Sequence, residues 1–205
     1  MAFLSLSGAG LIQCKNGLLY AKHEAHKVCV FMTGQALSIE FMDIFQSILV
    51  LAAFLCSMVA GFLFAYEIVV MPGIKNLDDR EFIRAFQVTD RIIQNNQPVF
   101  MLVWVGSAIA VLVSAFLGFD KLLGLDFYLL ALASLTYIVA VQLLTIVVHL
   151  PLNNRLQALN VNAMSETDLK VARSEFEPRW NSSNSVRTAA SVCVSAMLII
   201  LLFRL

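Results

Sequence analysis

Four long apolar stretches dominate this chain, and they limit what it can fold into more than any motif does. They cover residues 44–71, 98–119, 127–150 and 187–203. A hydrocarbon core about 30 Å thick needs about 20 helical residues, and the first three stretches reach that length with almost no charge inside. Because lipid offers the backbone no hydrogen-bond partners, such stretches are predicted to be helices. The chain is therefore predicted to be all-α, with four membrane spans.

The fourth stretch is the shortest. Its uncharged run extends from Thr188 to Phe203, between Arg187 and Arg204. It spans a bilayer when both arginines extend their guanidinium groups to the membrane surfaces, or when the bilayer thins locally. The alternative is a chain with three spans and a C-terminal helix that lies in the interface.

The composition agrees with a membrane protein and excludes one class of partner. Hydrophobic residues make up 60% of the chain and charged residues 14%, and the mean hydropathy is +0.81, far from the average of soluble domains. The 14 basic and 14 acidic residues balance. With no net positive charge and no basic arm, we expect the lipid bilayer as a partner and no nucleic acid.

The segments between the apolar stretches are long, short and long in turn. Between the first two stretches, Asp78 with Glu81 predicts the start of an amphipathic helix, which either runs in the interface or extends the second span through a kink at Pro98. Between the last two, Ser165 with Asp168 predicts another helix start. Only a few residues join the second and third stretches. The sequence thus predicts an up-down four-helix bundle with amphipathic cap helices on one side.

The first 41 residues differ from the rest of the chain. They mix glycine, serine, lysine and histidine with short apolar runs that show no sustained period. No helix or strand is predicted from such a pattern. We expect an irregular N-terminal extension over residues 1–41 and the membrane bundle over residues 42–205.

Small residues recur at every fourth position in the first two spans. They are Ala53, Ser57, Gly61 and Ala65 in the first, and Gly106, Ala110, Ser114 and Gly118 in the second. Small residues at this spacing let another helix backbone approach closely. We expect the first two spans to pack together, and the same pattern leaves a homo-oligomer open.

Basic residues are concentrated on the capped side of the predicted bundle. That side carries Lys75, Arg80, Arg84, Arg91, Arg155, Lys170, Arg173 and Arg179. The opposite side carries Lys121 and Arg204, together with Lys15, Lys22 and Lys27 of the first 41 residues. Positively charged loops tend to stay in the cytoplasm. We therefore predict a multi-pass membrane protein whose capped side faces the cytoplasm.

Polar side chains gather at one end of each span. In an up-down bundle, one level is shared by Glu67, Asn95, Asn96, His149, Asn153, Trp180, Asn184 and Arg187. Glu67 lies about one turn inside its span, where a carboxylate needs a partner, a proton or water. His149 suits proton transfer because imidazole titrates near neutral pH. The alternative is that Glu67 reaches the headgroups and that His149 anchors its span in the interface.

Two motifs in this polar layer resemble a known membrane family. One is His-x-Pro-x-Asn from His149 to Asn153, and the other is Trp-Asn-x-x-Asn-x-x-Arg from Trp180 to Arg187. Met71-Pro72-Gly73 and the Asn-x-x-Pro-x-Phe run from Asn95 to Phe100 add to the likeness. From about residue 44 to its end, the chain resembles the small four-span membrane proteins that include the anthrone oxygenases of polyketide pathways.

The resemblance implies an enzyme that oxidises an aromatic polyketide anthrone, or a similar apolar phenolic compound, with O₂ as co-substrate and no other cofactor. His149 would be the catalytic base, and Glu67 would orient it or relay the proton. The substrate would be bound by Asn95, Asn153, Trp180, Asn184 and Arg187, with polar groups stabilising a phenolate and the indole stacking on the planar rings. No metal is expected, because His149 and Glu67 are too few ligands to predict a metal site.

A non-catalytic alternative stays open at this point. The chain would then be a membrane scaffold or a small-ligand-binding protein, in which Arg187 pairs with Glu67 or Glu177. A cavity beside His149 would favour catalysis or ligand binding. A close-packed layer in which every polar group is paired would favour the scaffold.

Overall fold

The computed structural model describes residues 11–13, 19–21 and 25–205 of the chain, with side chains from residue 44 onward. The chain divides into two compact units, residues 1–44 and 45–205. Helix α1 (Ala25–Ala65) contributes to both units. The site and all the arguments below concern the second unit.

The first unit contains two short strands and the beginning of α1. Strands β1 (Leu11–Gln13) and β2 (Leu19–Ala21) pair antiparallel. The predicted irregular extension over residues 1–41 lies partly outside the described residues, and within the described part α1 already begins at Ala25. The run from Ala25 to Ile44 contains no proline and a single glycine, so its backbone offers little that would end a helix.

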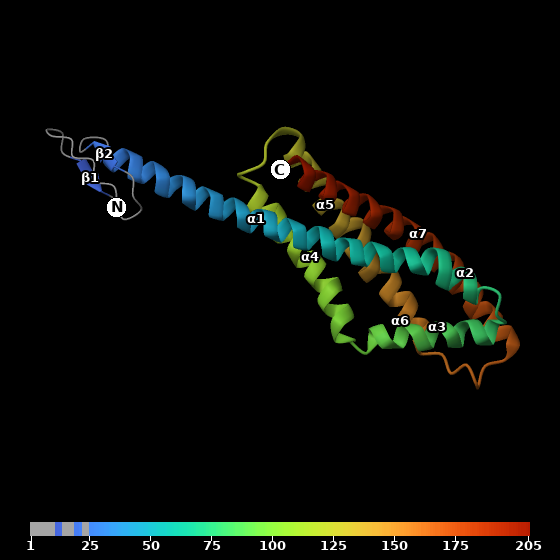
Figure 1. Cartoon of the computed structure of the whole chain (residues 1–205). Coiled ribbons are helices and arrows are strands. Elements are labelled where there is room, and N and C mark those ends of the chain that lie inside the picture. Colours follow the sequence, from blue (N-terminus) through green and yellow to red (C-terminus); the bar gives the residue numbers. More distant parts are fainter. Residues whose placement is uncertain (1–10, 14–18, 22–24) are drawn as a thin grey trace. The chain divides into compact units, whose positions relative to one another are not determined.

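The second unit is entirely helical in its described residues, as predicted. After α1 it comprises η1 (Tyr66–Val70), α2 (Met71–Ile74), α3 (Asp79–Gln94), α4 (Pro98–Gly118), α5 (Gly124–Thr136), η2 (Tyr137–Leu143), η3 (Thr145–His149), α6 (Leu150–Gln157) and α7 (Glu166–Arg204). The η segments are π-helices, which have a wider turn than an α-helix. Figure 1 shows α3 lying across one end of the long helices.

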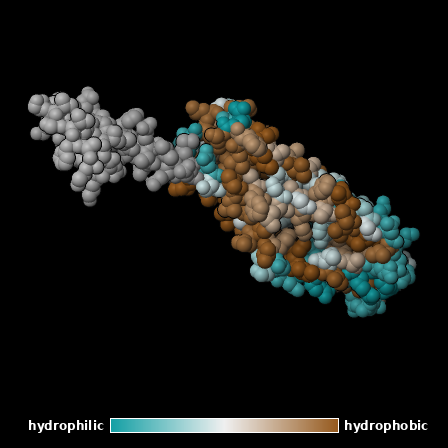
Figure 2. Space-filling view, viewed as in Figure 1, coloured by the Kyte–Doolittle hydropathy of each residue, from teal (hydrophilic) through white to brown (hydrophobic). Residues whose placement is uncertain are grey.

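Four helical runs in the described part of the chain are long and apolar enough to cross a membrane. They are Ile44–Ile74, Pro98–Gly118, Gly124–Gln157 and Glu166–Arg204. Figure 2 shows hydrophobic residues over the length of these helices, while hydrophilic residues gather at the end where α3 lies. The chain is an integral membrane protein with a four-helix bundle.

The fourth span is part of a longer helix than we predicted. We expected one helix starting after Ser165 and a separate span over residues 187–203, but α7 is continuous from Glu166 to Arg204 and contains Pro178. Ser165 does cap its start, because its side chain accepts a hydrogen bond from the Asp168 amide at 3.2 Å. The proline lies between Phe176 and Trp180, which are both buried, and this packing on both sides keeps the helix in one piece.

Of the two arrangements predicted for the amphipathic helix, the extension of the second span through a kink at Pro98 is wrong, because α3 and α4 are separate helices. Asp78 caps α3 as expected, accepting from the Glu81 amide at 2.8 Å. The helix ends at Asn95, Asn96 has a φ of 55°, and Pro98 starts α4, a position where its missing N–H costs no hydrogen bond. This turn lets α3 fold back and pack against α6 and α7.

Hydrogen bonds to backbone carbonyls hold α3 in this place. Gln87 donates through Nε2 to the carbonyls of Leu156 and Leu159, at 2.8 and 3.0 Å. Arg80 donates to the carbonyls of Val161 and Met164 and pairs with Glu166. These contacts connect α3 to the segment between α6 and α7, so the two long connections form one cap.

The two small-residue stripes have different surroundings. A Cβ atom added at Gly118 would lie 2.6 Å from Leu130 Cδ2 and 3.1 Å from Phe45 Cε2, and one added at Gly106 would lie 3.5 Å from Leu55 Cδ1. The α4 stripe therefore lies close to α1, in agreement with the expected packing of the first two spans. In α1, Ser57, Gly61 and Ala65 are exposed.

Two of the prolines inside the spans, Pro72 and Pro151, follow π-helical turns. η1 ends two residues before Pro72, and η3 ends two residues before Pro151. A proline ring collides with the carbonyl of the residue four positions earlier in a regular α-helix. A wider turn moves that carbonyl away, which is why the helices bulge at these two points.

Candidate functional site

A cavity of about 440 Å³ lies inside the second unit at its capped end. Its volume falls within the range of about 300 to 1,000 Å³ that is usual for small-molecule sites. Helices α1, α3, α4, α6 and α7 and all three π-helical segments contribute to its walls. The lining side chains include Tyr66, Phe86, Asp90, Phe100, Trp104, Gln142, Thr145, His149, Asn153, Trp180 and Arg187.

His149 is buried in the wall of this cavity, with 2% of its surface exposed. Its Nε2 lies 3.0 Å from Ser183 Oγ, and its ring meets the ring of Trp180 edge-on with a centroid distance of 5.1 Å. When Nε2–H donates to the Ser183 hydroxyl, Nδ1 keeps a free lone pair. The contact with Ser183 is compatible with this tautomer, in which Nδ1 can take up a proton.

Arg187 is the buried cation of the cavity wall. Its Nη1 donates to Thr145 Oγ1 at 2.9 Å, its Nη2 donates to Asn184 Oδ1 at 2.8 Å, and its Cζ lies 5.9 Å from the centroid of the Trp180 ring. Among the described residues, no carboxylate lies within ion-pair distance of it. The guanidinium is therefore held by neutral partners, with no opposite charge beside it among the described residues.

Glu67 is connected to Arg187 by hydrogen bonds through the Asn184 side chain, without a direct ion pair between the two. The Asn184 amide donates through Nδ2 to Glu67 Oε2 at 2.8 Å while its Oδ1 accepts from Arg187, and Ser185 Oγ donates to Glu67 Oε1. We predicted that Glu67 orients His149 or relays its proton, and in the non-catalytic alternative that Arg187 pairs with Glu67 or Glu177. In the structure, Glu67 orients the amide that holds Arg187, and Glu177 pairs with Arg173 at 2.8 Å.

Three lining residues have a buried nitrogen atom without a hydrogen-bond partner among the described residues. These atoms are Nδ1 of His149, Nε2 of Gln142 and Nε of Arg187. A buried polar group left unpaired costs about 1 to 3 kcal/mol. All three residues line one cavity, while the three nitrogen atoms themselves have almost no accessible surface, so a ligand with oxygen atoms would become their partner after a small shift of these side chains.

Asp90 on α3 is a second buried polar centre, and we did not predict it. It is 3% exposed and lines the cavity. Its carboxylate accepts hydrogen bonds from Asn153 at 2.8 Å, Gln94 at 3.0 Å and Gln157 at 3.1 Å. Asn153 in turn accepts from Trp180 Nε1 at 3.0 Å, so Asp90 fixes both side chains in the wall.

Aromatic rings form much of the remaining wall. Trp180 has ring neighbours in Phe86 at 5.5 Å and Tyr66 at 5.8 Å between centroids. Phe100 stacks on Trp104 at 5.5 Å between centroids. The cavity thus combines a polar part around His149 and Arg187 with an apolar, ring-lined part that suits a planar compound.

The predicted site residues fall into three positions. His149, Asn153, Trp180 and Arg187 line the cavity. Asn184 is fully buried and lies directly behind Arg187, and Glu67 lies behind Asn184. Asn95 is exposed at the end of α3, and its neighbour Asn96 lines the cavity in its place.

Gln142 and Thr145 also line the cavity and were not predicted. Gln142 is the single amide side chain inside the third apolar stretch, and an amide in the middle of a span is itself a signal of a polar interior. Asp90 gave no such signal, because it lies among the other charged residues of the amphipathic α3.

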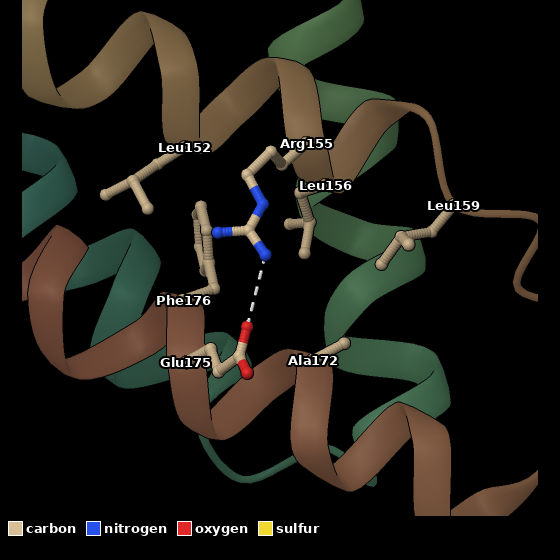
Figure 3. A pocket seen from close by; sticks show the side chains of 7 residues that line it. All are labelled: Leu152, Arg155, Leu156, Leu159, Ala172, Glu175 and Phe176. Carbon is tan, nitrogen blue, oxygen red and sulfur yellow. Dashed lines mark hydrogen bonds and ion pairs between the residues drawn. The ribbon is translucent and has the colours of Figure 1, made fainter.

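A second hollow, shown in Figure 3, is of a different kind. It measures about 70 Å³ and lies between α6 and α7, with Arg155 and Glu175 forming an ion pair of 3.3 Å across it. Both side chains are largely exposed, and such surface pairs contribute little energy. In the described part of the chain, no group of three or more His, Cys, Asp and Glu residues is placed to hold a metal ion.

Glu67→Gln should lower both stability and activity. The amide can still accept from Asn184 and donate to the Ser185 hydroxyl, but both hydrogen bonds lose the charge of the carboxylate and become roughly half as strong. The weaker bond to Asn184 lets this side chain and Arg187 shift. We expect a lower melting temperature in detergent and a slower turnover. Glu81→Gln, on the exposed face of α3, is the control. If neither property changes in Glu67→Gln, Glu67 lies in the headgroups instead.

Comparison with known proteins identifies the family. A family profile described as "Anthrone oxygenase" matches residues 91–197, which is more than half of the chain and includes α4 to α6, most of α7 and most of the cavity wall. No curated protein and no solved structure gives a significant match. The chain belongs to the anthrone oxygenase family.

Proposed function

We propose that this protein is an oxygenase that converts an aromatic polyketide anthrone, or a similar apolar phenolic compound, to the corresponding quinone with O₂ and without a bound cofactor. The observation that supports this proposal is the cavity at the capped end. It combines a histidine, an arginine and an amide that all have unpaired nitrogen atoms with a wall of aromatic rings.

The proposed reaction begins with removal of a proton from the methylene carbon opposite the ketone of the anthrone. The resulting enolate gives one electron to O₂, and the carbon radical and superoxide combine to form a carbon–oxygen bond. The peroxide takes up a proton, then the O–O bond breaks as the remaining hydrogen leaves the carbon, so that water and a new carbonyl group form. One O₂ is consumed for each quinone and each water produced.

The residues at the cavity have separate roles in this scheme. His149 takes the proton through Nδ1, while Ser183 holds Nε2. Arg187 and Gln142 stabilise negative charge on the enolate oxygen, because fixed donors in a dry site act most strongly on charge that develops during the reaction. Trp180 and Phe86 offer ring faces and edges to a planar substrate.

A non-catalytic ligand-binding protein is the second candidate, and the same cavity supports it. The two candidates differ in what happens to the compound. A binding protein would hold an anthrone or a quinone without accelerating its oxidation, whereas the oxygenase consumes O₂. A scaffold without a ligand is the weaker candidate, because a scaffold gains no stability from the unpaired nitrogen atoms at the cavity.

We also propose that the capped side faces the cytoplasm. The basic residues of α3, α6 and the first half of α7 lie on that side and outnumber those at the opposite end.

Incubating the purified protein with anthrone in lipid nanodiscs, under air and under argon, tests the proposal. We expect quinone to form under air only, with O₂ and anthrone consumed in equal amounts and with turnover unchanged after dialysis against a chelator. Metal content is measured on the same samples. Oxidation no faster than in empty nanodiscs would contradict the oxygenase, and loss of turnover after dialysis would contradict its independence of metals.

A further inference from the structure

The exposed part of the cavity wall shows where the cavity opens. Among the described side chains that line it, four are exposed, namely Asn96, Val105, Ile146 and Leu150. Asn96 lies just before α4, and Val105 lies within it. Ile146 lies in η3, and Leu150 begins α6. The mouth of the cavity is therefore between α4 and the η3–α6 segment.

This mouth lies in the apolar part of the protein surface. Val105, Ile146 and Leu150 are all inside candidate membrane spans, with 45%, 59% and 43% of their surfaces exposed. From Asn96 to Val105 the mouth follows nine residues, about 14 Å at 1.5 Å per helical residue. In a hydrocarbon core about 30 Å thick, it thus extends from the interface to nearly half the depth.

The other side of α4 is closed by aromatic rings. A groove of about 270 Å³ between α1 and α4 shares Phe62, Phe100 and Trp104 with the cavity. The ring centroids of Phe62 and Phe100 are 5.1 Å apart, and Phe100 stacks on Trp104. These rings separate the groove from the cavity, which leaves the gap between α4 and η3 as the open side.

Access from water at the capped end is restricted by α3. Phe86, Asp90, Ile93 and Gln94 of this helix line the cavity, and Gln87 and Arg80 tie the helix to the segment after α6. The lining residues Phe86 and Asp90 are buried. The cap therefore covers the end of the cavity that is closest to the aqueous phase.

We infer that the cavity takes up its ligand from the bilayer, through the mouth between α4 and η3, and that this ligand is an apolar planar aromatic compound dissolved in lipid. The apolar rim matches the hydrocarbon chains outside, and the polar groups of the cavity lie behind it, where the oxygen atoms of such a compound find partners. The inference rests on the proposed function only where it identifies the ligand as the anthrone substrate. The route itself applies to any apolar planar aromatic compound dissolved in lipid.

Tryptophan fluorescence tests this route without any need for turnover. The chain has two tryptophans, so Trp104→Phe leaves Trp180 as the single reporter at the cavity. We expect 9,10-anthraquinone dissolved in phosphatidylcholine vesicles to quench Trp180, and aqueous iodide to have little effect. Equal or stronger quenching by iodide would overturn the route. The absence of quenching by anthraquinone would overturn it as well, and this is the result expected if a second copy of the chain covers the mouth.

Two pairs of substitutions in the Trp104→Phe protein locate the mouth. Ile146→Phe narrows it, whereas Val147→Phe changes the next residue, which is equally exposed but does not line the cavity. The quenching should develop severalfold more slowly in Ile146→Phe and at the unchanged rate in Val147→Phe. The second pair repeats the comparison on α4: Val105→Phe narrows the mouth, and Ile109→Phe is the control, because Ile109 is exposed but does not line the cavity. Equal rates within both pairs would overturn the inference, whereas quenching without anthrone oxidation would contradict only the oxygenase.

Discussion

His149→Ala should abolish quinone formation and leave the fold intact. The substitution removes the proposed base, and general base catalysis contributes about 10² to 10⁴ in rate. The side chain has one hydrogen bond, to Ser183, and a ring contact with Trp180, so expression and detergent melting should stay nearly unchanged. Turnover of anthrone under air and thermal melting of the same sample measure the two effects.

Two further measurements separate a base from a structural residue. Added imidazole should restore part of the activity of His149→Ala, because the substitution opens space at the cavity for a free base. Ser183→Ala should reduce turnover less than His149→Ala, since it removes only the group that holds Nε2. Full turnover in His149→Ala would remove the assignment of the base altogether.

Arg187→Met should lose most of the activity without losing stability. Removing a fixed donor at developing negative charge costs about 10² to 10³ in rate. The buried guanidinium has only Thr145 and Asn184 as partners, and a charge at membrane depth without an ion pair costs several kcal/mol. The substitution also removes two hydrogen bonds and leaves the buried Asn184 Oδ1 without this donor, at a cost of about 1 to 3 kcal/mol. The two effects offset each other, so the melting temperature should change little.

Arg179→Met is the matched control for this prediction. Arg179 lies on the same helix, is exposed and does not line the cavity, so neither turnover nor melting should change. A marked fall in the melting temperature of Arg187→Met would mean that the arginine is a structural link between α7 and η3. Unchanged turnover would mean that it plays no part in the reaction.

The spans and the caps could be predicted because local signals determine them. An apolar run of about 20 residues is helical in lipid whatever surrounds it, and Asp78 and Ser165 each cap the helix that follows them. The up-down order then brings His149 and Arg187 to one level, where the His149 ring and the Arg187 guanidinium both lie next to the Trp180 ring.

The details of the site could not be predicted because they depend on turns between elements. The position of Asp90 follows from the backbone conformation at Asn96, which folds α3 back over the bundle instead of extending α4. The order Glu67, Asn184, Arg187 depends on how α7 is rotated against η1. Sequence spacing places these residues at one level but does not tell which of them are direct neighbours.

The wide turns before Pro72 and Pro151 have a consequence for the comparison of relatives. A π-helical turn holds one residue more than an α-helical turn, so deleting one residue between Thr145 and His149 would convert this turn to a regular one and leave the helix on either side in nearly the same orientation. The same deletion within α4, where the turns are regular, would rotate one side of the helix against the other by about 100°. The spans would remain as hydrophobic as before in both cases. A gap of a single position in an alignment is therefore compatible with an intact cavity wall at the wide turns, but not within the regular helices that line the cavity.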